Sequence, residues 1–277
     1  IEHSDFESAL SLATGTPDLV YPVARGEIGL GTINPTAFLT MAYRGTGPFA
    51  QPLPLRTIAM MPSWDRMGFV VSPRTEIGSL SDIKERKFPL RISIRQSQAH
   101  ATRFVVDEVL GALGTSLEQI GGWGGACQYV DTPNARVRQE GIRDGTIDAV
   151  FDEGIGSWGR TALENGWRFL PVEGEALRRM EALGWPVRVL PKDHLPGLDS
   201  DIMTPSFSDW PLFTSANTSD DVAYKLIEAL DVARPHITWD RETPVELADL
   251  ARTTDGDPLA VPLHPGAERY YEEHGAI

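Results

Sequence analysis

Polar residues gather where the sequence predicts that a strand ends and a helix begins. Such corners occur at 14–16, 34–36, 96–103 and 152–158. The first turn of a helix has unpaired N–H groups and a partial positive charge, so each corner could hold a carboxylate. Ordinary capping is the preferred explanation for any single corner, whereas convergence of all of them would favour a binding site. The ligand contacts expected at these corners are Thr16, Asn34, Thr36, His100, Thr102, Arg103, Asp152 and Trp158.

Two further residues could complete this site. Trp64 and Arg66 follow a predicted strand at 56–61. An indole at Trp64 or Trp158 could pack on the apolar part of a ligand, and Arg66 or Arg103 could hold a carboxylate through two parallel hydrogen bonds. Alternatively, Trp64 packs on a neighbouring loop and Arg66 is exposed and loosely paired with a carboxylate such as Asp65. The sequence leaves both interpretations open.

The sequence contains no motif typical of an enzyme, a metal site or a cofactor site. The glycine-rich run 121–125, predicted to be a loop, lacks the Lys-Ser/Thr of a phosphate-binding loop, and no Gly-x-Ser-x-Gly motif occurs. The six histidines lack metal-ligand spacing. Cys127, the only cysteine, is best explained as an inert small side chain. Asp152 and Glu153 could act as acid and base, but a solvated loop or an acceptor for ligand N–H groups is preferred. We therefore predict no metal, no cofactor and no catalysis.

Composition limits the partners and the size of the fold. The net charge of −14 argues against nucleic acid or an anionic membrane as the main partner. The 277 residues are enough for two lobes, and no apolar run is long enough to span a membrane. Because Ile1 does not resemble a natural start, we expect that leading residues, including a removed signal peptide, precede it.

Predicted strands alternate with predicted helices along the chain, which indicates α/β units with largely parallel sheets. In such folds ligands bind at the carboxyl ends of strands, so we expect a ligand to bind at the corners named above. The predicted strands are 28–33, 56–61, 68–71, 90–94, 147–151, 168–172, 186–190 and 202–215, and the predicted helices are 18–25, 34–42, 79–84, 102–113, 134–143, 158–165, 173–183, 220–234, 243–251 and 265–275.

Several short stretches, taken in order, resemble one family. These are Gly15-Thr16, Ala24–Gly29, Ser79–Lys84, Arg143–Phe151 and, most specifically, Leu263-His264-Pro265-Gly266-Ala267. In order and spacing they are similar to the TAXI-type solute receptors of TRAP transporters. The chain departs from that pattern at Ala99-His100-Ala101-Thr102, where the family usually carries Gly-Ser-Gly-Thr, which suggests a changed pocket.

The resemblance implies a bilobed α/β fold of the periplasmic-binding-protein type II, with two mostly parallel sheets, flanking helices and a ligand cleft between the lobes. Lobe 1 would comprise 1–88 and 188–277, and lobe 2 would comprise 89–187. The implied function is capture of an amino acid, 2-oxo acid or dicarboxylate in the periplasm, for uptake by TRAP membrane subunits, with no insertion of this chain into the membrane. The alternatives are an enzyme on the same fold, with Asp152, Glu153 or His100 as acid or base, and a stand-alone ligand sensor.

Overall fold

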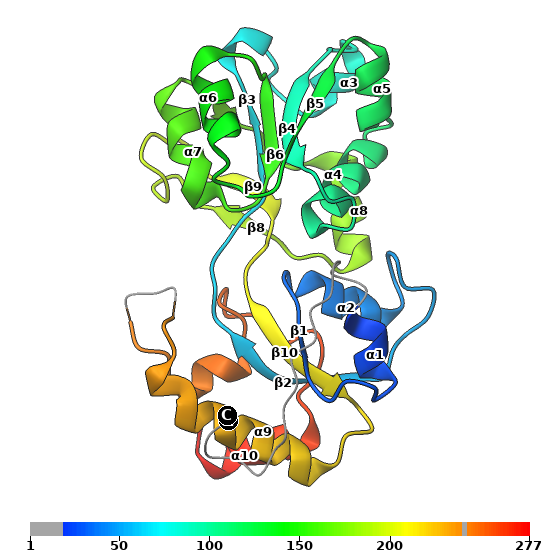
Figure 1. Ribbon diagram of the computed structural model, residues 1–277, viewed down its shortest axis with the longest axis vertical. Helices are drawn as coiled ribbons and strands as arrows, with labels where there is room; N and C mark the ends of the chain where they lie inside the picture. Colours follow the sequence, from blue (N-terminus) through cyan, green and yellow to red (C-terminus); the bar gives the residue numbers. More distant parts are fainter. Residues whose placement is uncertain (1–18, 240–242) are drawn as a thin grey trace. The chain divides into compact units, whose positions relative to one another are not determined.

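The computed structural model describes residues 19–239 and 243–277, in two compact units (Figure 1). Unit 1 joins the described residues up to Trp64 to those from Ser208 onward, and unit 2 comprises Asp65–Phe207. Each unit contains a β-sheet flanked by helices, which confirms the α/β class. Thr16 lies outside the described residues.

The boundaries of the two units differ from the lobe boundaries that were expected from the sequence. Residues 65–88 and 188–207, assigned to lobe 1 from the sequence, fall in unit 2. The physical reason is strand pairing: β3 (Gly68–Val71) pairs with β6 (Ala149–Asp152) and β7 (Arg168–Phe169). Likewise β8 (Val187–Leu190) pairs with β9 (Ile202–Pro205), which keeps the second stretch in the same unit.

Unit 1 is built on a three-stranded antiparallel sheet in the order β1-β10-β2. Its strands are β1 (Gly31–Thr32), β2 (Leu55–Met61) and β10 (Trp210–Ser215). Its helices are α1 (Val20–Ala24), α2 (Ala37–Arg44), α9 (Asp220–Ala233) and α10 (Pro265–Glu273), with the 3₁₀ turns η3 (Arg234–His236) and η4 (Leu247–Ala251). The strand expected at 28–33 is thus shorter, and the helix expected at 243–251 is a 3₁₀ turn.

The C-terminal helix α10, where the sequence predicted a helix at 265–275, packs on unit 1. Ala267, Tyr270 and Tyr271 join a core with residues of β2 and α9. The Tyr271 hydroxyl donates to the carbonyl oxygens of Ile58 and Leu250, at 3.1 and 3.2 Å. Gly266 is required there, because a Cβ at this position would lie 2.0 Å from the carbonyl oxygen of Asp220.

Unit 2 contains a five-stranded sheet in the order β5-β4-β6-β3-β7. The strand β4 (Arg91–Arg95) runs parallel to β5 (Ala126–Val130) and β6, whereas β3 is antiparallel to β6 and β7. The expectation of mostly parallel sheets is therefore wrong outside β5-β4-β6, because β3, the β8-β9 pair and the whole sheet of unit 1 are paired antiparallel. Within the parallel group, the carboxyl ends of all three strands meet at one edge.

The helices of unit 2 are α3 (Ser81–Glu85), α4 (Ala101–Ala112), α5 (Leu117–Gly122), α6 (Arg136–Asp144), α7 (Ile155–Glu164) and α8 (Gly174–Leu183), with the 3₁₀ turn η2 (Pro73–Thr75). The loop expected at 121–125 is wrong in part, because α5 continues to Gly122. Ser116 caps that helix by accepting from the Gln119 amide. Neither α5 nor β5 was expected from the sequence. None of the helices in the described ranges is both long and apolar enough to cross a membrane.

Candidate functional site

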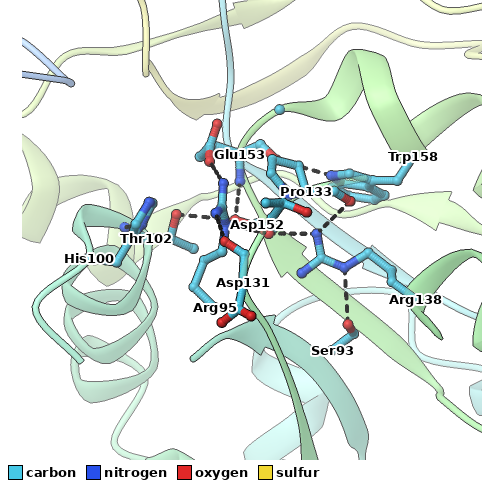
Figure 2. A network of polar contacts seen from close by, with 12 residues as sticks. Ser93, Arg95, His100, Thr102, Asp131, Pro133, Arg138, Asp152, Glu153 and Trp158 are labelled. Carbon is cyan, nitrogen blue, oxygen red and sulfur yellow. Dashed lines mark hydrogen bonds and ion pairs between the residues drawn. The ribbon is translucent and has the colours of Figure 1, made fainter. Parts of the chain in front are cut away.

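A buried cluster of ion pairs lies where the strands β4 and β6 end (Figure 2). Arg95 is the last residue of β4, and Asp152 is the last residue of β6. Because these strands are parallel neighbours, their final side chains meet at one edge of the sheet. The Arg95 Nε donates to both carboxylate oxygens of Asp152 at 3.0 Å. We use "the Arg95 cluster" for Asp65, Arg95, Arg138, Asp152 and Glu153.

Asp152 is the acceptor that holds this cluster together. Its side chain is fully buried and also accepts from Arg138 Nη1 at 2.5 Å and from Thr102 Oγ1 at 3.2 Å. The Glu153 amide donates to the same carboxylate at 2.9 Å. A buried carboxylate with this many donors is a structural anion, since its lone pairs are engaged by the protein itself. Asp152 is therefore poorly placed to act as an acid or a base.

Arg138 supplies the second cation from α6. Its side chain is fully buried, and burial lowers the pKa of the guanidinium while the charge of Asp152 opposes that change. It also donates to Ser93 Oγ at 3.0 Å and to the Pro133 carbonyl oxygen at 3.1 Å. These bonds fix α6 against the sheet, because a buried charge must be both paired and hydrogen-bonded.

Glu153 and Asp65 form a carboxyl pair beside Arg95. Burial, together with the neighbouring charges of Asp152 and Asp65, raises the pKa of Glu153 to about 8. Burial also raises the pKa of Asp65, which accepts from the Gly154 amide at 2.8 Å. Glu153 accepts a hydrogen bond from Arg95 Nη2. At neutral pH Glu153 therefore keeps its proton and shares it with Asp65, so two arginines face two carboxylates in the cluster.

The N-terminus of α4 lies directly against this cluster. His100 is its N-cap: the Nδ1 atom accepts from the Thr102 amide at 3.2 Å. Burial, and then the positive charge of Arg95, lower the pKa of His100, while Glu153 and Asp152 act in the opposite direction. The imidazole is therefore neutral at pH 7, and because Nδ1 is an acceptor, its proton is on Nε2.

Arg103 forms no ion pair with a carboxylate, although Asp107, one turn further along α4, lies close enough for the charge of Arg103 to oppose the rise in its pKa that burial causes. Only 8% of the residue is exposed, and among the described residues no ion pair joins it to an acid. Its Nη1 donates to the Arg95 carbonyl oxygen over a long 3.3 Å, and its guanidinium lies 5.7 Å from the centre of the Tyr129 ring. The buried Nε–H has no acceptor in the part of the chain that the structure describes. An unpaired buried donor costs roughly 1–3 kcal/mol, which an incoming acceptor would recover.

Arg66, the other arginine predicted to hold a carboxylate, is held by its own chain instead. It is 2% exposed, and it forms a β-bridge with Ser206. Its guanidinium donates to the carbonyl oxygens of Val189 and Asp65, at 3.3 and 3.0 Å, and to Ser206 Oγ at 3.1 Å. These bonds tie together the two segments by which unit 2 joins unit 1.

Trp158 lies in the core of unit 2. Its ring is fully buried and stacks on Phe169, with centroids 6.1 Å apart, and its Nε1 donates to the Glu153 carbonyl oxygen at 3.0 Å. Gly68 of β3 lies against the indole, since a Cβ there would be 2.7 Å from it. Trp158 therefore supports the turn that carries Glu153, and in this structure its ring is covered.

The structure thus brings together the corners 96–103 and 152–158. The predicted contacts Asn34, Thr36 and Trp64 belong to unit 1, where each is partly exposed. Thr36 begins α2 and its side chain makes no capping hydrogen bond. No group of three or more metal-ligating side chains comes together within the described ranges. Cys127 is half-buried, and burial raises the pKa of its thiol.

Sequence reasoning missed Arg95 and Arg138. Arg95 fell between the strand predicted at 90–94 and the corner predicted at 96–103, although a charged residue ending a buried strand was a usable signal. Arg138 lies on a largely polar helix, so nothing in the local pattern distinguished it from an exposed arginine. Its burial depends on Asp152, 14 residues further along the chain, and on Ser93, 45 residues earlier.

Several solved structures are similar to the chain at low identity. A Xanthomonas citri protein bound to chloride ion is 12% identical over 95% of this chain and 81% of its own, with a TM-score of 0.43. A glycine betaine and L-proline binding protein of an ABC transporter from Borrelia burgdorferi is 16% identical over 79% and 75%, with a TM-score of 0.40. A TRAP periplasmic solute-binding protein from Rhodobacter sphaeroides is 11% identical over 77% and 61%, with a TM-score of 0.33.

The sequence as a whole also matches a family profile. The match covers residues 13–275 and thus both units, including β4, α4, β6 and the C-terminal helix. The chain belongs to the NMT1-like family.

Proposed function

We propose that this protein is a periplasmic solute-binding protein that captures a small carboxylate for uptake by a TRAP transporter. The observation that carries the proposal is Arg103, a buried arginine that forms no ion pair with a carboxylate, at the carboxyl ends of parallel strands. Membership in the NMT1-like family and the ordered resemblance to TAXI-type receptors support the transport role.

Charge favours an anion at this edge of unit 2. Within the Arg95 cluster the two arginines are balanced by Asp152 and by the proton-sharing pair of Glu153 and Asp65. Arg103 adds a positive charge, with Asp107 exposed one turn further along α4, and the neutral His100 adds none. The N-terminal end of α4 contributes a further partial positive charge. A carboxylate that reaches Arg103 would form the two parallel hydrogen bonds for which a guanidinium is suited.

A screen for ligand-induced stabilisation tests the ligand class. A carboxylate present at a hundred times its Kd should raise the free energy of unfolding by roughly 2.7 kcal/mol. The screen uses thermal unfolding with amino acids, 2-oxo acids, dicarboxylates and aromatic acids. The absence of a shift with every acid would refute the proposed ligand class.

A pair of arginine variants tests the position of the site. Arg103→Met keeps the length of the side chain but removes its charge and its donors, and it should weaken binding of the best acid at least tenfold. The matched control is Arg160→Met, which removes an exposed arginine of α7 in the same unit. Unchanged binding by Arg103→Met would refute the assignment of Arg103.

The transporter partner needs its own assay. Membrane vesicles that contain TRAP membrane subunits should accumulate the labelled acid only when this protein is added. Uptake that does not depend on the protein would contradict the proposed role in transport.

A further inference from the structure

The carboxyl groups of the Arg95 cluster are engaged by the protein itself. Asp152 accepts from two arginines, from Thr102 and from a backbone amide. Asp65 accepts from the amides of Arg66 and Gly154, and it shares the proton of Glu153. Glu153 also accepts from Arg95. A ligand ammonium placed against this cluster would meet only carboxyl groups that are already held by donors.

Two hydrogen-bond donors at this edge of unit 2, in contrast, lack acceptors within the described residues. The buried Arg103 Nε–H has no acceptor among the described residues. The N-capping role of His100 leaves its Nε2–H as a second donor without a partner in that part of the chain. His100 precedes α4 and Arg103 lies on its first turn, while the contact of Arg103 with the Arg95 carbonyl oxygen places its guanidinium at the end of β4.

A second histidine cap shows what is distinctive about His100. His264 caps α10 in the same way, with Nδ1 accepting from the Gly266 amide at 3.2 Å. Its Nε2 is 2.9 Å from the Thr218 carbonyl oxygen, so both ring nitrogens are used within the fold. The cap fixes the tautomer in both cases, but at His100 it leaves the outer nitrogen as a donor and never as an acceptor.

We infer that unit 2 selects a carboxylate without a neighbouring ammonium group, such as a 2-oxo or 2-hydroxy acid, over the corresponding amino acid. The inference rests on the proposed function and narrows its ligand class. An oxo or hydroxyl oxygen beside the carboxylate can accept from His100 or Arg103. An ammonium in that place would be desolvated beside two donors and a cation, and the acids nearest His100, which are Glu153 and Asp152, are already held by arginines.

Matched pairs of acids test this selection. The probes are pyruvate and alanine, 2-oxoglutarate and glutamate, and phenylpyruvate and phenylalanine, each compared at equal concentration by thermal unfolding and titration calorimetry. For the pair that binds best, the 2-oxo acid should bind at least tenfold more tightly than the amino acid. An amino acid that binds as tightly as its 2-oxo partner, or more tightly, overturns this inference and leaves the carboxylate proposal standing. If no acid of either kind binds, the proposed function fails and the inference fails with it.

A substitution at His100 locates the origin of the selection. His100→Asp retains an N-capping oxygen but replaces the outer donor by an acidic acceptor. The preference for the 2-oxo acid should therefore fall at least tenfold, with the helix content by circular dichroism unchanged. The control is His236→Asp, the same change at an exposed residue of unit 1, which should keep the wild-type preference. His100→Asn, which also caps, is used if the Asp variant fails to fold. An unchanged preference in a folded His100 variant overturns the role assigned to this residue.

Discussion

The buried anion Asp152 gives the sharpest test of how unit 2 is held together. Asp152→Asn keeps the shape of the side chain but removes the charge that balances Arg95 and Arg138. It also replaces one acceptor oxygen by an NH₂ group that faces other donors. Breaking a buried ion pair from one side costs about 3–5 kcal/mol. Since domains of ordinary size are stabilised by about 5–15 kcal/mol, the variant should lose a large part of its free energy of unfolding.

The same two strands provide a matched control. Arg91 at the start of β4 is paired with Asp148, just before β6, at 2.6 Å, but 44% of that arginine side chain is exposed. Asp148 is itself largely buried, with 13% of its side chain exposed, but water can reach the arginine of this pair, so Asp148→Asn should cost less than Asp152→Asn. Urea unfolding followed by circular dichroism gives both values from the change in midpoint. If Asp152→Asn costs no more than Asp148→Asn, then burial does not determine the importance of Asp152, and our account of the cluster is wrong.

Three further predictions test other parts of the fold. Because the pKa of Glu153 is raised to about 8, the folded state holds this proton more tightly than the unfolded chain, so stability should fall as pH rises from about 5 through 8. Glu153→Gln should flatten that dependence, as measured by urea midpoints between pH 5 and 9, and an equal slope in both proteins would contradict the shared proton with Asp65. Trp158→Ala should lower the free energy of unfolding by about 3–5 kcal/mol, because the ring is fully buried, and a thermal melt that matches the wild type would rule out this packing. Gly266→Ala should destabilise unit 1 by about 1–3 kcal/mol, because the added Cβ would meet the Asp220 carbonyl oxygen, and calorimetry that shows no loss would contradict that close approach.

Much of the fold could be predicted from local patterns. The C-terminal helix was predicted at 265–275, and in the structure Pro265 begins the helix and Gly275 has a positive φ of 67°. The long helices α4 and α9 were expected from their apolar spacing, and both lie within two residues of the predicted limits. In contrast, α5 and β5 were not recognised, because the polar and glycine-rich sequence around them has no clear periodicity.

Part of the candidate site could also be predicted. Thr102 and Asp152 were both predicted as ligand contacts at corners where a strand ends and a helix begins, and their side-chain oxygens are 3.2 Å apart. Such corners depend on the order of elements along the chain and not on side-chain packing. They could not identify Arg95 and Arg138 as the partners of Asp152, since an arginine is exposed or buried according to which distant groups surround it.

The sequence by itself determined the alternation of strands and helices, the limits of the longest helices α4 and α9, and a resemblance to solute-binding receptors. These features depend on interactions within a few residues, such as capping, periodicity and short motifs. Only the tertiary structure decided which arginine is available to a ligand. Arg66 and Arg103 look equivalent in sequence, but Arg66 meets Val189 and Ser206, which come from far along the chain, whereas Arg103 retains an unpaired buried donor. The role of a buried charge depends on partners that only folding brings within hydrogen-bonding distance.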